Sequence, residues 1–249
     1  MDWFKELYDE FRMKHGFGAI PEQRTAREVD FLVEELALQE RSKVLDLFCG
    51  TGRHCVELAK RGIQSVGVDS NPDYLAVARD KAHAASVNVE FVQGDVRGVD
   101  FGRDYDAVII MYQSFGYFTD AEDRDVLRRA YEALKPGGRF FIEILNRDNL
   151  LQNWQADSEK EVDRVKVVEE RTFDVLTSRI NAKITRYGGE RPVVRAVSWR
   201  MYSAHEIKWI LEEVGFSFLA GYANLNRAPL TLETRMMRLV FVKPRAEKP

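Results

Sequence analysis

Hydrophobic and polar positions in the first 150 residues follow two alternating patterns. Short apolar runs are typical of buried strands, and between them apolar residues recur at helical spacing. The runs predict five strands, at 43–48, 65–69, 88–93, 105–112 and 139–146. Strands that alternate with helices along a chain predict a parallel sheet covered by helices.

Capping residues mark the expected helix ends. Asn71-Pro72 predicts a helix start, because Asn accepts hydrogen bonds from free N–H groups and Pro fits the first turn. A helix is expected to end at Lys135, because Pro136 cannot continue it. A stripe at helical spacing predicts one N-terminal helix, with Trp3, Phe4, Leu7, Tyr8 and Phe11 on one face. Three pairs have the spacing of a capping box: Thr25–Glu28, Thr119–Glu122 and Ser203–Glu206.

The pattern changes after Asn146. Residues 147–165 are polar and mixed, and we expect a helix or an irregular connection there. Residues 171–187 and 192–202 are rich in Thr, Val and Ile around Gly188-Gly189, which predicts two long antiparallel strands. A last helix, ending at Gly215, and strands at 216–222 and 236–242 follow. We therefore expect a core formed by 1–146 and 203–249, with 147–202 inserted as an antiparallel roof.

Composition narrows the class of protein. The chain has 249 residues, 45% of them hydrophobic, and its 37 Lys and Arg against 40 Asp and Glu give a net charge of −3. This balance gives no bulk reason to expect nucleic acid as a partner. The longest aliphatic run, 107–111, is too short to cross a bilayer, and the first residues lack the apolar stretch of a signal peptide. We expect a cytoplasmic protein, as a monomer or homodimer, that does not contact a membrane.

Several single residues have a structural interpretation beside a functional one. Cys49 and Cys55 form no disulfide framework, and packing is their better explanation. His54 is expected to face a ligand, to lie at the surface, or to support the residues that contact a ligand from behind. Four scattered histidines give no metal-ligand spacing, so no metal is expected. Glu143, inside an expected central strand, needs a partner, and we favour a structural ion pair.

The strongest chemical signal is the turn Gly50-Thr51-Gly52, which follows a buried strand and opens a helix. Glycines let the backbone approach a ligand, and the helix start presents free N–H groups. Asp46, Asp69 and Asp95 each lie at or near the end of an expected strand around this turn. Three carboxylates suit a cationic ligand and would repel a pyrophosphate. A dinucleotide fingerprint would also need glycine where the chain has Cys55.

These features resemble the class I S-adenosylmethionine-dependent methyltransferases. The resemblance covers about 20–145, and the final helix and two strands also fit. It implies an α/β, Rossmann-like, seven-stranded sheet in the order 3-2-1-4-5-7-6 with strand 7 antiparallel. The segments that carry it are VLDLFCGTGRH (44–54), VGVDSNP (66–72), VQGDV (92–96), YDAVIIMYQSFGYF (105–118) and LKPGG (134–138).

The resemblance also implies a set of cofactor contacts. Gly50 and Gly52 would border the methionine end, Asp69 would hold the ribose, and Asp95 with Val96 the adenine. Phe48 stands where the family usually has glycine. Arg24 is a candidate for the cofactor carboxylate, with a solvated helix-start arginine as the equal alternative. The full expected set is Arg24, Asp46, Phe48, Cys49, Gly50, Thr51, Gly52, Asp69, Ser70, Asn71, Asp95, Val96 and Met111.

The segment after the fourth strand is where family members meet the transferred methyl group. Gln113, Ser114 and Tyr117 are the candidate catalytic residues, because they can hydrogen-bond an acceptor. The alternative is that the aromatics here cover the sheet end. The candidate acceptor contacts are Tyr8, Phe115, Asn146 and Tyr202. Arginines of the roof could bind an acidic substrate, although a solvated face is the commoner explanation: Arg179, Arg186, Arg191, Arg195 and Arg200.

The sequence thus predicts an enzyme that moves a methyl group from S-adenosyl-L-methionine to a small-molecule N or O acceptor, releasing S-adenosyl-L-homocysteine. Orientation supplies much of the rate of such a displacement, and no dedicated base is evident. Three alternatives remain: a tRNA or rRNA methyltransferase with the same core, a non-catalytic module that binds the cofactor, and an NAD-dependent dehydrogenase.

Overall fold

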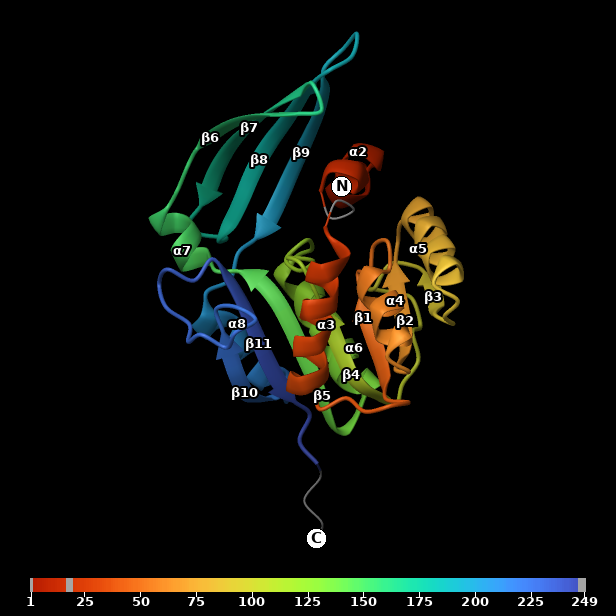
Figure 1. The fold of residues 1–249 in the computed structure, drawn as a ribbon. Helices are drawn as coiled ribbons and strands as arrows, with labels where there is room; N and C mark the ends of the chain where they lie inside the picture. The colour runs from red at the N-terminus through yellow and green to blue at the C-terminus, as the bar shows by residue number, and fades with distance from the viewer. Residues whose placement is uncertain (1, 17–19, 246–249) are drawn as a thin grey trace.

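The computed structural model describes residues 2–16 and 20–245 (Figure 1). Its core is a seven-stranded sheet with the order β10-β11-β5-β4-β1-β2-β3. The pairs β3-β2-β1-β4-β5 are parallel, and β11 runs antiparallel to both β5 and β10. This confirms the predicted order and the antiparallel strand. The strands are β1 Lys43–Leu47, β2 Gln64–Asp69, β3 Glu90–Gln93, β4 Tyr105–Ile110, β5 Leu134–Leu145, β10 Ser217–Tyr222 and β11 Met236–Val242.

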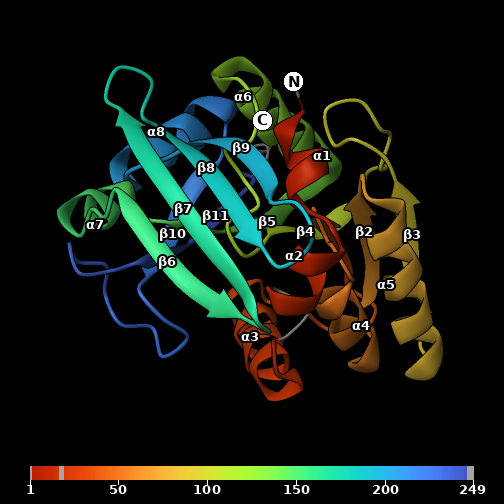
Figure 2. The ribbon, with the colours of Figure 1, turned by 90° about the horizontal axis from the view of Figure 1, so that it is seen from above.

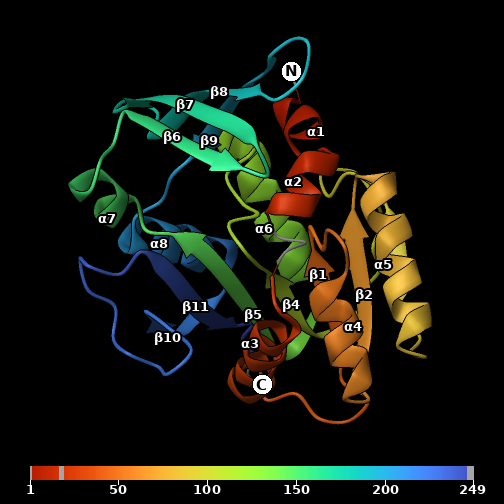
Figure 3. The ribbon, with the colours of Figure 1, turned by 45° about the horizontal axis from the view of Figure 1, so that its top comes forward.

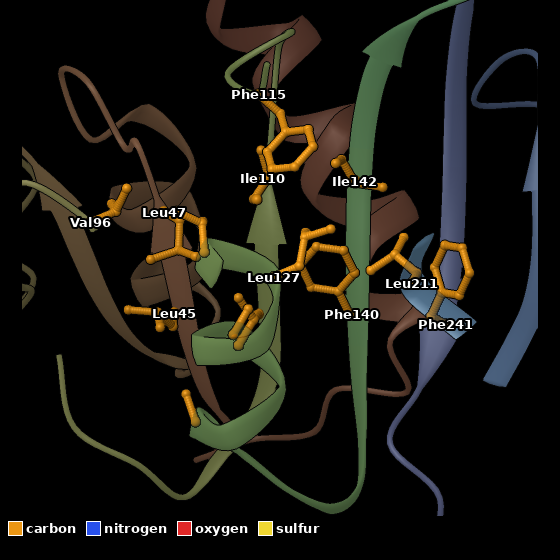
Figure 4. Close-up of a cluster of buried hydrophobic side chains, with 14 of the residues drawn as sticks. Leu45, Leu47, Val96, Ile110, Phe115, Leu127, Phe140, Ile142, Leu211 and Phe241 are labelled. Atoms are coloured by element: carbon orange, nitrogen blue, oxygen red, sulfur yellow. The ribbon is translucent and has the colours of Figure 1, made fainter. Parts of the chain in front are cut away.

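Helices cover both faces of this sheet (Figure 2). One face carries α3 (Glu22–Glu35), α4 (Arg53–Lys60) and α5 (Pro72–Ala84), and the other α6 (Asp120–Ala133) and α8 (Ala204–Val214). Strand alternation divides the core between them. Leu45 and Leu47 pack with the α6 side chain of Leu127 and the β5 ring of Phe140 (Figure 4). Asp46, between the two leucines, therefore points to the α4 face.

Two of the three predicted capping boxes mark helix starts. Thr119 and Glu122 form the full reciprocal box of α6, and the Ser203 side chain accepts from the N–H of Glu206 at the start of α8. The third prediction is wrong: α3 begins at Glu22 after Pro21, so Thr25 lies inside the helix. Thr25 and Glu28 are buried and bind groups of α4 instead of the helix start.

Other boundaries also differ from prediction. The N-terminal stripe forms two short helices, α1 (Trp3–Leu7) and α2 (Glu10–His15), because Asp9 interrupts it and caps α2 by accepting from the N–H of Arg12. Helix α6 ends at Ala133 and β5 begins at Leu134, so Pro136 lies in the strand. The β4–β5 pairing is irregular between Tyr105 and Ala107, beside that proline.

A second, antiparallel sheet stands above the carboxyl ends of the parallel strands (Figures 1 and 3). It follows α7 (Arg147–Gln152) and has the order β6-β7-β8-β9, and we call it the roof. The predicted strand 171–187 is divided by a turn at 175–178, in which the Asp174 carboxylate accepts from the N–H groups of Leu176 and Thr177. The roof strands are β6 Asp157–Val162, β7 Val165–Asp174, β8 Arg179–Tyr187 and β9 Val193–Arg200.

Candidate active site

A cavity of about 760 Å³ lies between the core sheet, helices α1 and α2, and the roof. Its floor comes from the ends of β1, β2, β4 and β5, and α1 with α2 closes one side (Figure 3). Ligands of open parallel sheets bind beyond the carboxyl ends of the strands, and this volume suits a small molecule. Most of the predicted cofactor residues line it: Arg24, Asp46, Phe48, Cys49, Gly50, Thr51, Asp69, Ser70, Asn71 and Met111.

The turn after β1 takes a conformation that L side chains rarely adopt. Phe48 (φ 63°), Gly50 (φ 55°) and Gly52 (φ 67°) all lie in the left-handed region. Gly50 borders the cavity, whereas Gly52 is a packing residue: a Cβ there would meet the Phe91 ring at 2.7 Å. Phe48 occupies its glycine-like position with its ring edge against Tyr117, 5.7 Å between centroids. Phe48 thus adopts a backbone conformation that glycine takes more readily.

Asp69 joins this turn to the end of β2. Its carboxylate accepts from the N–H of Gly50 at 2.8 Å and from the N–H of Asn71 at 2.9 Å. Burial raises the pKa of Asp69, and these two N–H groups counter part of the rise. The carboxylate is therefore fixed in direction at the cavity wall.

Asp46 is a second, deeper carboxylate. It is 1% exposed, and the thiol of Cys55 lies 3.5 Å from its Oδ2. Burial raises the pKa of Asp46 to about 7. Near neutral pH this group therefore changes charge, and a cation in the cavity would favour its ionised form.

Behind the turn lies a polar group that the sequence did not reveal, which we call the Glu28 cluster (Arg24, Thr25, Glu28, Arg53 and His54). Glu28 accepts from Arg24 Nε at 3.0 Å, from Arg53 Nη1 and from His54 Nε2 at 3.0 Å. Although burial opposes it, the hydrogen bond from His54 and the Arg53 charge lower the pKa of Glu28 to about 2. Burial and the Arg53 charge lower the pKa of His54 to about 4, so its ring is neutral and donates through Nε2. His54 thus lies in the core rather than at the surface.

The position of Glu28 in the helical repeat of α3 is the sequence signal that could have identified it as buried. Thr25, Glu28 and Leu32 recur at helical spacing and share the buried side of α3. A buried carboxylate requires a cation partner, and Arg53 supplies it from the first turn of α4. One atom of the cluster is left over: Arg53 Nη2 is buried and has no hydrogen-bond partner among the described residues. Arg53 lines the cavity, so a ligand oxygen could satisfy this donor.

The segment after β4 forms the next part of the wall. Tyr112 (φ 57°) and Gln113 (φ 61°) are in the left-handed region, and the Gln113 side-chain oxygen accepts from the N–H of Leu145. The Tyr117 hydroxyl lies 2.5 Å from that of Tyr8 and donates to the Gln113 carbonyl at 3.2 Å. Burial raises the pKa of both tyrosines, so neither is a base near neutral pH. Ser114 also lines the cavity.

Glu143 has the structural partner that the sequence predicted. Arg238 Nη2 lies 2.6 Å from its Oε1, and its Oε2 accepts from the N–H of Tyr112. The carboxylate lines the cavity but is held by this pair. The cysteines are free and buried, and both pack with Leu75, as expected for a packing role.

Three predicted acceptor contacts do not reach the cavity. The rings of Phe115 and Tyr202 pack on each other in the core at 5.5 Å, and the Tyr202 hydroxyl donates to Asp123. Asn146 caps α7 through the N–H of Asp148 and donates its side-chain amide to the Thr234 carbonyl. A position at a strand end does not settle which way a side chain points, and these three point into packing. Tyr8 does line the cavity.

Besides Gly52, two predicted cofactor contacts lie outside the cavity lining. Val96 is buried in the core, and the Asp95 carboxylate pairs with Arg97 Nη2 at 2.6 Å. Arg97 in turn reaches Asp2 and Glu122, so this end of β3 is tied to α1 and α6. An adenine contact at Asp95 stays a prediction.

Neither a metal group nor a membrane span is evident in residues 2–16 and 20–245. No set of three or more His, Cys, Asp and Glu residues in these ranges is arranged to hold a metal ion. None of the helices described there is long and apolar enough to cross a membrane.

Comparison with known proteins agrees with this geometry. A family model described as a methyltransferase domain matches residues 44–138, from β1 to the start of β5. Demethylmenaquinone methyltransferase of Thermus thermophilus is 38% identical over 112 residues, which are 43% of this chain and 50% of that protein. Glycine/sarcosine N-methyltransferase of Halorhodospira halochloris is 31% identical over 135 residues, 53% of this chain and 50% of that protein. The chain spans about half the length of the curated relatives it matches.

Solved structures match along nearly the whole chain, roof included. An S-adenosylmethionine-dependent methyltransferase from Clostridium acetobutylicum has a TM-score of 0.79 at 18% identity, covering 97% of this chain and 99% of that one. The CcbJ methyltransferase from Streptomyces caelestis has a TM-score of 0.80 at 23% identity, covering 98% and 97%. At these identities the likeness shows the fold. Residues 44–138 thus match a methyltransferase domain, and nearly the whole chain shares the fold of these methyltransferase structures.

Proposed function

We propose that this protein transfers a methyl group from S-adenosyl-L-methionine to an N or O atom of a small molecule held between the sheet edge and the roof. The observation that carries the proposal is the Asp69 carboxylate, fixed to the N–H of Gly50 at the wall of a covered cavity. An acid in this place can accept both hydroxyls of a ribose.

The remaining residues of the floor fit the rest of the donor. When bound, it supplies an already activated methyl group on a positively charged sulfur. Asp46 and Asp69 give the floor the opposite charge. The unpartnered Nη2 of Arg53 and the guanidinium of Arg24 would hold the carboxylate of the methionine end.

Transfer of the methyl group then depends on the orientation of the acceptor and on the exclusion of water from the cavity. Tyr8 and Tyr117 lie at the wall between α1 and β4, where they can hydrogen-bond an acceptor and direct its lone pair. Both phenols stay protonated near neutral pH, and Glu143 is held by Arg238. Among the other described carboxylates of the lining, Asp46 and Asp69 are assigned to the donor and Glu169 lies beside Arg171, which favours an acceptor that presents a lone pair, such as an amine.

Calorimetry with S-adenosylhomocysteine tests the donor site. Asp69→Asn should weaken binding at least about tenfold, because a charged hydrogen-bond acceptor contributes about 1.5–3 kcal/mol. Asp80→Asn, an exposed change on α5, is the control and should leave the affinity unchanged. Wild-type protein that binds NADH and neither the methyl donor nor its product would refute the proposal. Unchanged affinity in Asp69→Asn would refute the ribose assignment alone.

A further inference from the structure

The cavity has a floor and a roof of opposite charge. Asp46, Asp69 and Glu143 line the floor, while the two arginines beside them, Arg24 and Arg53, both bind Glu28. This half suits the cationic donor. The charges of the other half face the space where the acceptor would lie.

The roof turns cationic side chains inward. Side chains of a strand alternate between its faces, and all four roof strands place a Lys or Arg at the cavity. These residues are Lys160, Arg171, Arg186 and Arg195, and Glu169 is the one roof carboxylate that accompanies them in the described lining. The outer face of β6 is acidic instead, with exposed Asp157, Glu159 and Glu161. The positive charge of the roof therefore faces the cavity rather than the outer surface of β6.

Some of these cations are already neutralised. Arg186 binds both carboxylate oxygens of Asp9, and Arg195 donates to the Glu6 carbonyl. Arg171 Nε lies 3.8 Å from Glu169. The contacts of Arg186 and Arg195 hold α2 and α1 against the roof. The pair of Arg171 and Glu169 lies within the roof itself.

Three other cations of the lining are paired with no acidic side chain of the described residues. Within the described ranges, the side chains of Arg12, Lys160 and Arg235 have neither a hydrogen bond nor an ion pair. They come from α2, from β6 and from the residue before β11. All three are exposed and also line the cavity, so they lie at its opening.

The space behind this opening is apolar. Its walls include Leu145 at the end of β5, Leu150 of α7 and residues of the roof cluster: Val167, Ile180, Ile184 and Met201. Such walls favour a ligand body that loses water on binding.

We infer that the acceptor is an amphipathic small molecule whose apolar body lies under the roof and whose anionic group, a carboxylate or a phosphate, is attracted to the cationic opening that Arg12, Lys160 and Arg235 line. This inference rests on the proposed methyl transfer. It adds that acceptor and donor are sorted by charge, so each ligand is drawn to its own half of the cavity.

The test compares three probes that share one apolar body: 2-naphthoate, 2-naphthyl phosphate and the neutral 2-naphthol. Their binding is measured by fluorescence titration with saturating S-adenosylhomocysteine present. At least one anion should bind about tenfold more tightly than 2-naphthol, and the better of the two identifies carboxylate or phosphate. Equal affinity of all three probes, or no binding of either anion, would overturn the inference.

Variants locate the anionic group. The triple change Arg12→Gln, Lys160→Gln and Arg235→Gln should remove the advantage of the anions and leave 2-naphthol binding unchanged. The matched control is Lys166→Gln, Lys183→Gln and Lys208→Gln, which removes three exposed, acid-paired charges outside the cavity lining and should keep the advantage. An advantage that survives the first triple would contradict the assignment. Binding of S-adenosylhomocysteine, measured alongside, should be the same in all proteins, so a failed donor site is recognised separately.

Discussion

The floor of the cavity and its cover are held by different kinds of contact. Below the turn, Glu28 joins Arg53, His54 and Arg24 in a buried network within the continuous core. The cover, formed by α1, α2 and the roof, combines partly exposed contacts, such as Asp9 with Arg186 and the rings of Trp3 and Trp199, with the buried α1 side chains of Phe4 and Leu7. Breaking a buried ion pair is strongly destabilising, whereas exposed ion pairs contribute little to folding stability. We therefore expect the floor to be organised before a ligand arrives, and the cover to open more easily than the floor.

Breaking the floor network should have the largest effect. Glu28→Ala leaves the Arg53 guanidinium without its buried counter-charge, so unfolding should become easier by about 3–5 kcal/mol. Urea denaturation measures this loss. Glu22→Ala, an exposed change on the same helix, should alter stability by less than about 0.5 kcal/mol. A loss below about 1 kcal/mol for Glu28→Ala would show that the network does not stabilise the floor.

Asp46 should make folding stability depend on pH in the opposite direction to an ordinary ion-paired carboxylate. Its folded pKa of about 7 lies above the unfolded value of 3.8, so the folded state binds more protons between these values. The Asp46 contribution to stability therefore falls as pH rises, by about 2 kcal/mol from pH 5.5 to 8.5. Asp46→Asn should remove this decline, which urea titrations of both proteins at both pH values will measure.

The same ionisation should separate the charged donor from its neutral product. The affinity ratio of S-adenosylmethionine to S-adenosylhomocysteine should rise severalfold from pH 6 to 8, because only the donor carries the sulfonium charge that favours ionised Asp46. Calorimetry with the two ligands checks this. A ratio that changes equally in Asp46→Asn would assign the effect to another group.

The sequence predicted local features better than pairings between distant segments, for a physical reason. Asp69 and the turn at Gly50 depend on local patterns, in which a strand, a glycine and an acid follow one another along the chain. Glu28 depends on Arg53, 25 residues away, and no local pattern records that pairing. The roof turn at 175–178 has neither glycine nor proline, because the Asp174 side chain supplies its hydrogen bonds.

The direction in which side chains point was the second feature that the sequence did not predict. The sheet order and the ends of β1, β2 and β4 were predicted closely, yet Asn146 and Tyr202 turn into packing rather than into the cavity. Their partners, Thr234 and Asp123, lie 88 and 79 positions away in the chain. Hydrophobic periodicity places a residue on a strand, but only tertiary contacts decide what its polar group binds.

Loosening the cover should have the smallest effect on global stability and a clear local one. Asp9→Asn weakens a partly exposed pair with Arg186, so the free energy of unfolding should change by no more than about 1 kcal/mol. Amide hydrogen exchange in α1 and α2 should nevertheless accelerate severalfold, while α3 keeps its protection, since local opening requires only that the cover contacts break. Glu10→Gln, at an exposed position of α2, is the control. The double variant Asp9→Asn with Arg186→Gln should exchange faster still, because it also removes the Arg186 guanidinium from the Phe11 ring, 4.7 Å from its centroid. Acceleration that spreads equally into α3 would mean that floor and cover unfold as a single unit, and the distinction between them would be lost.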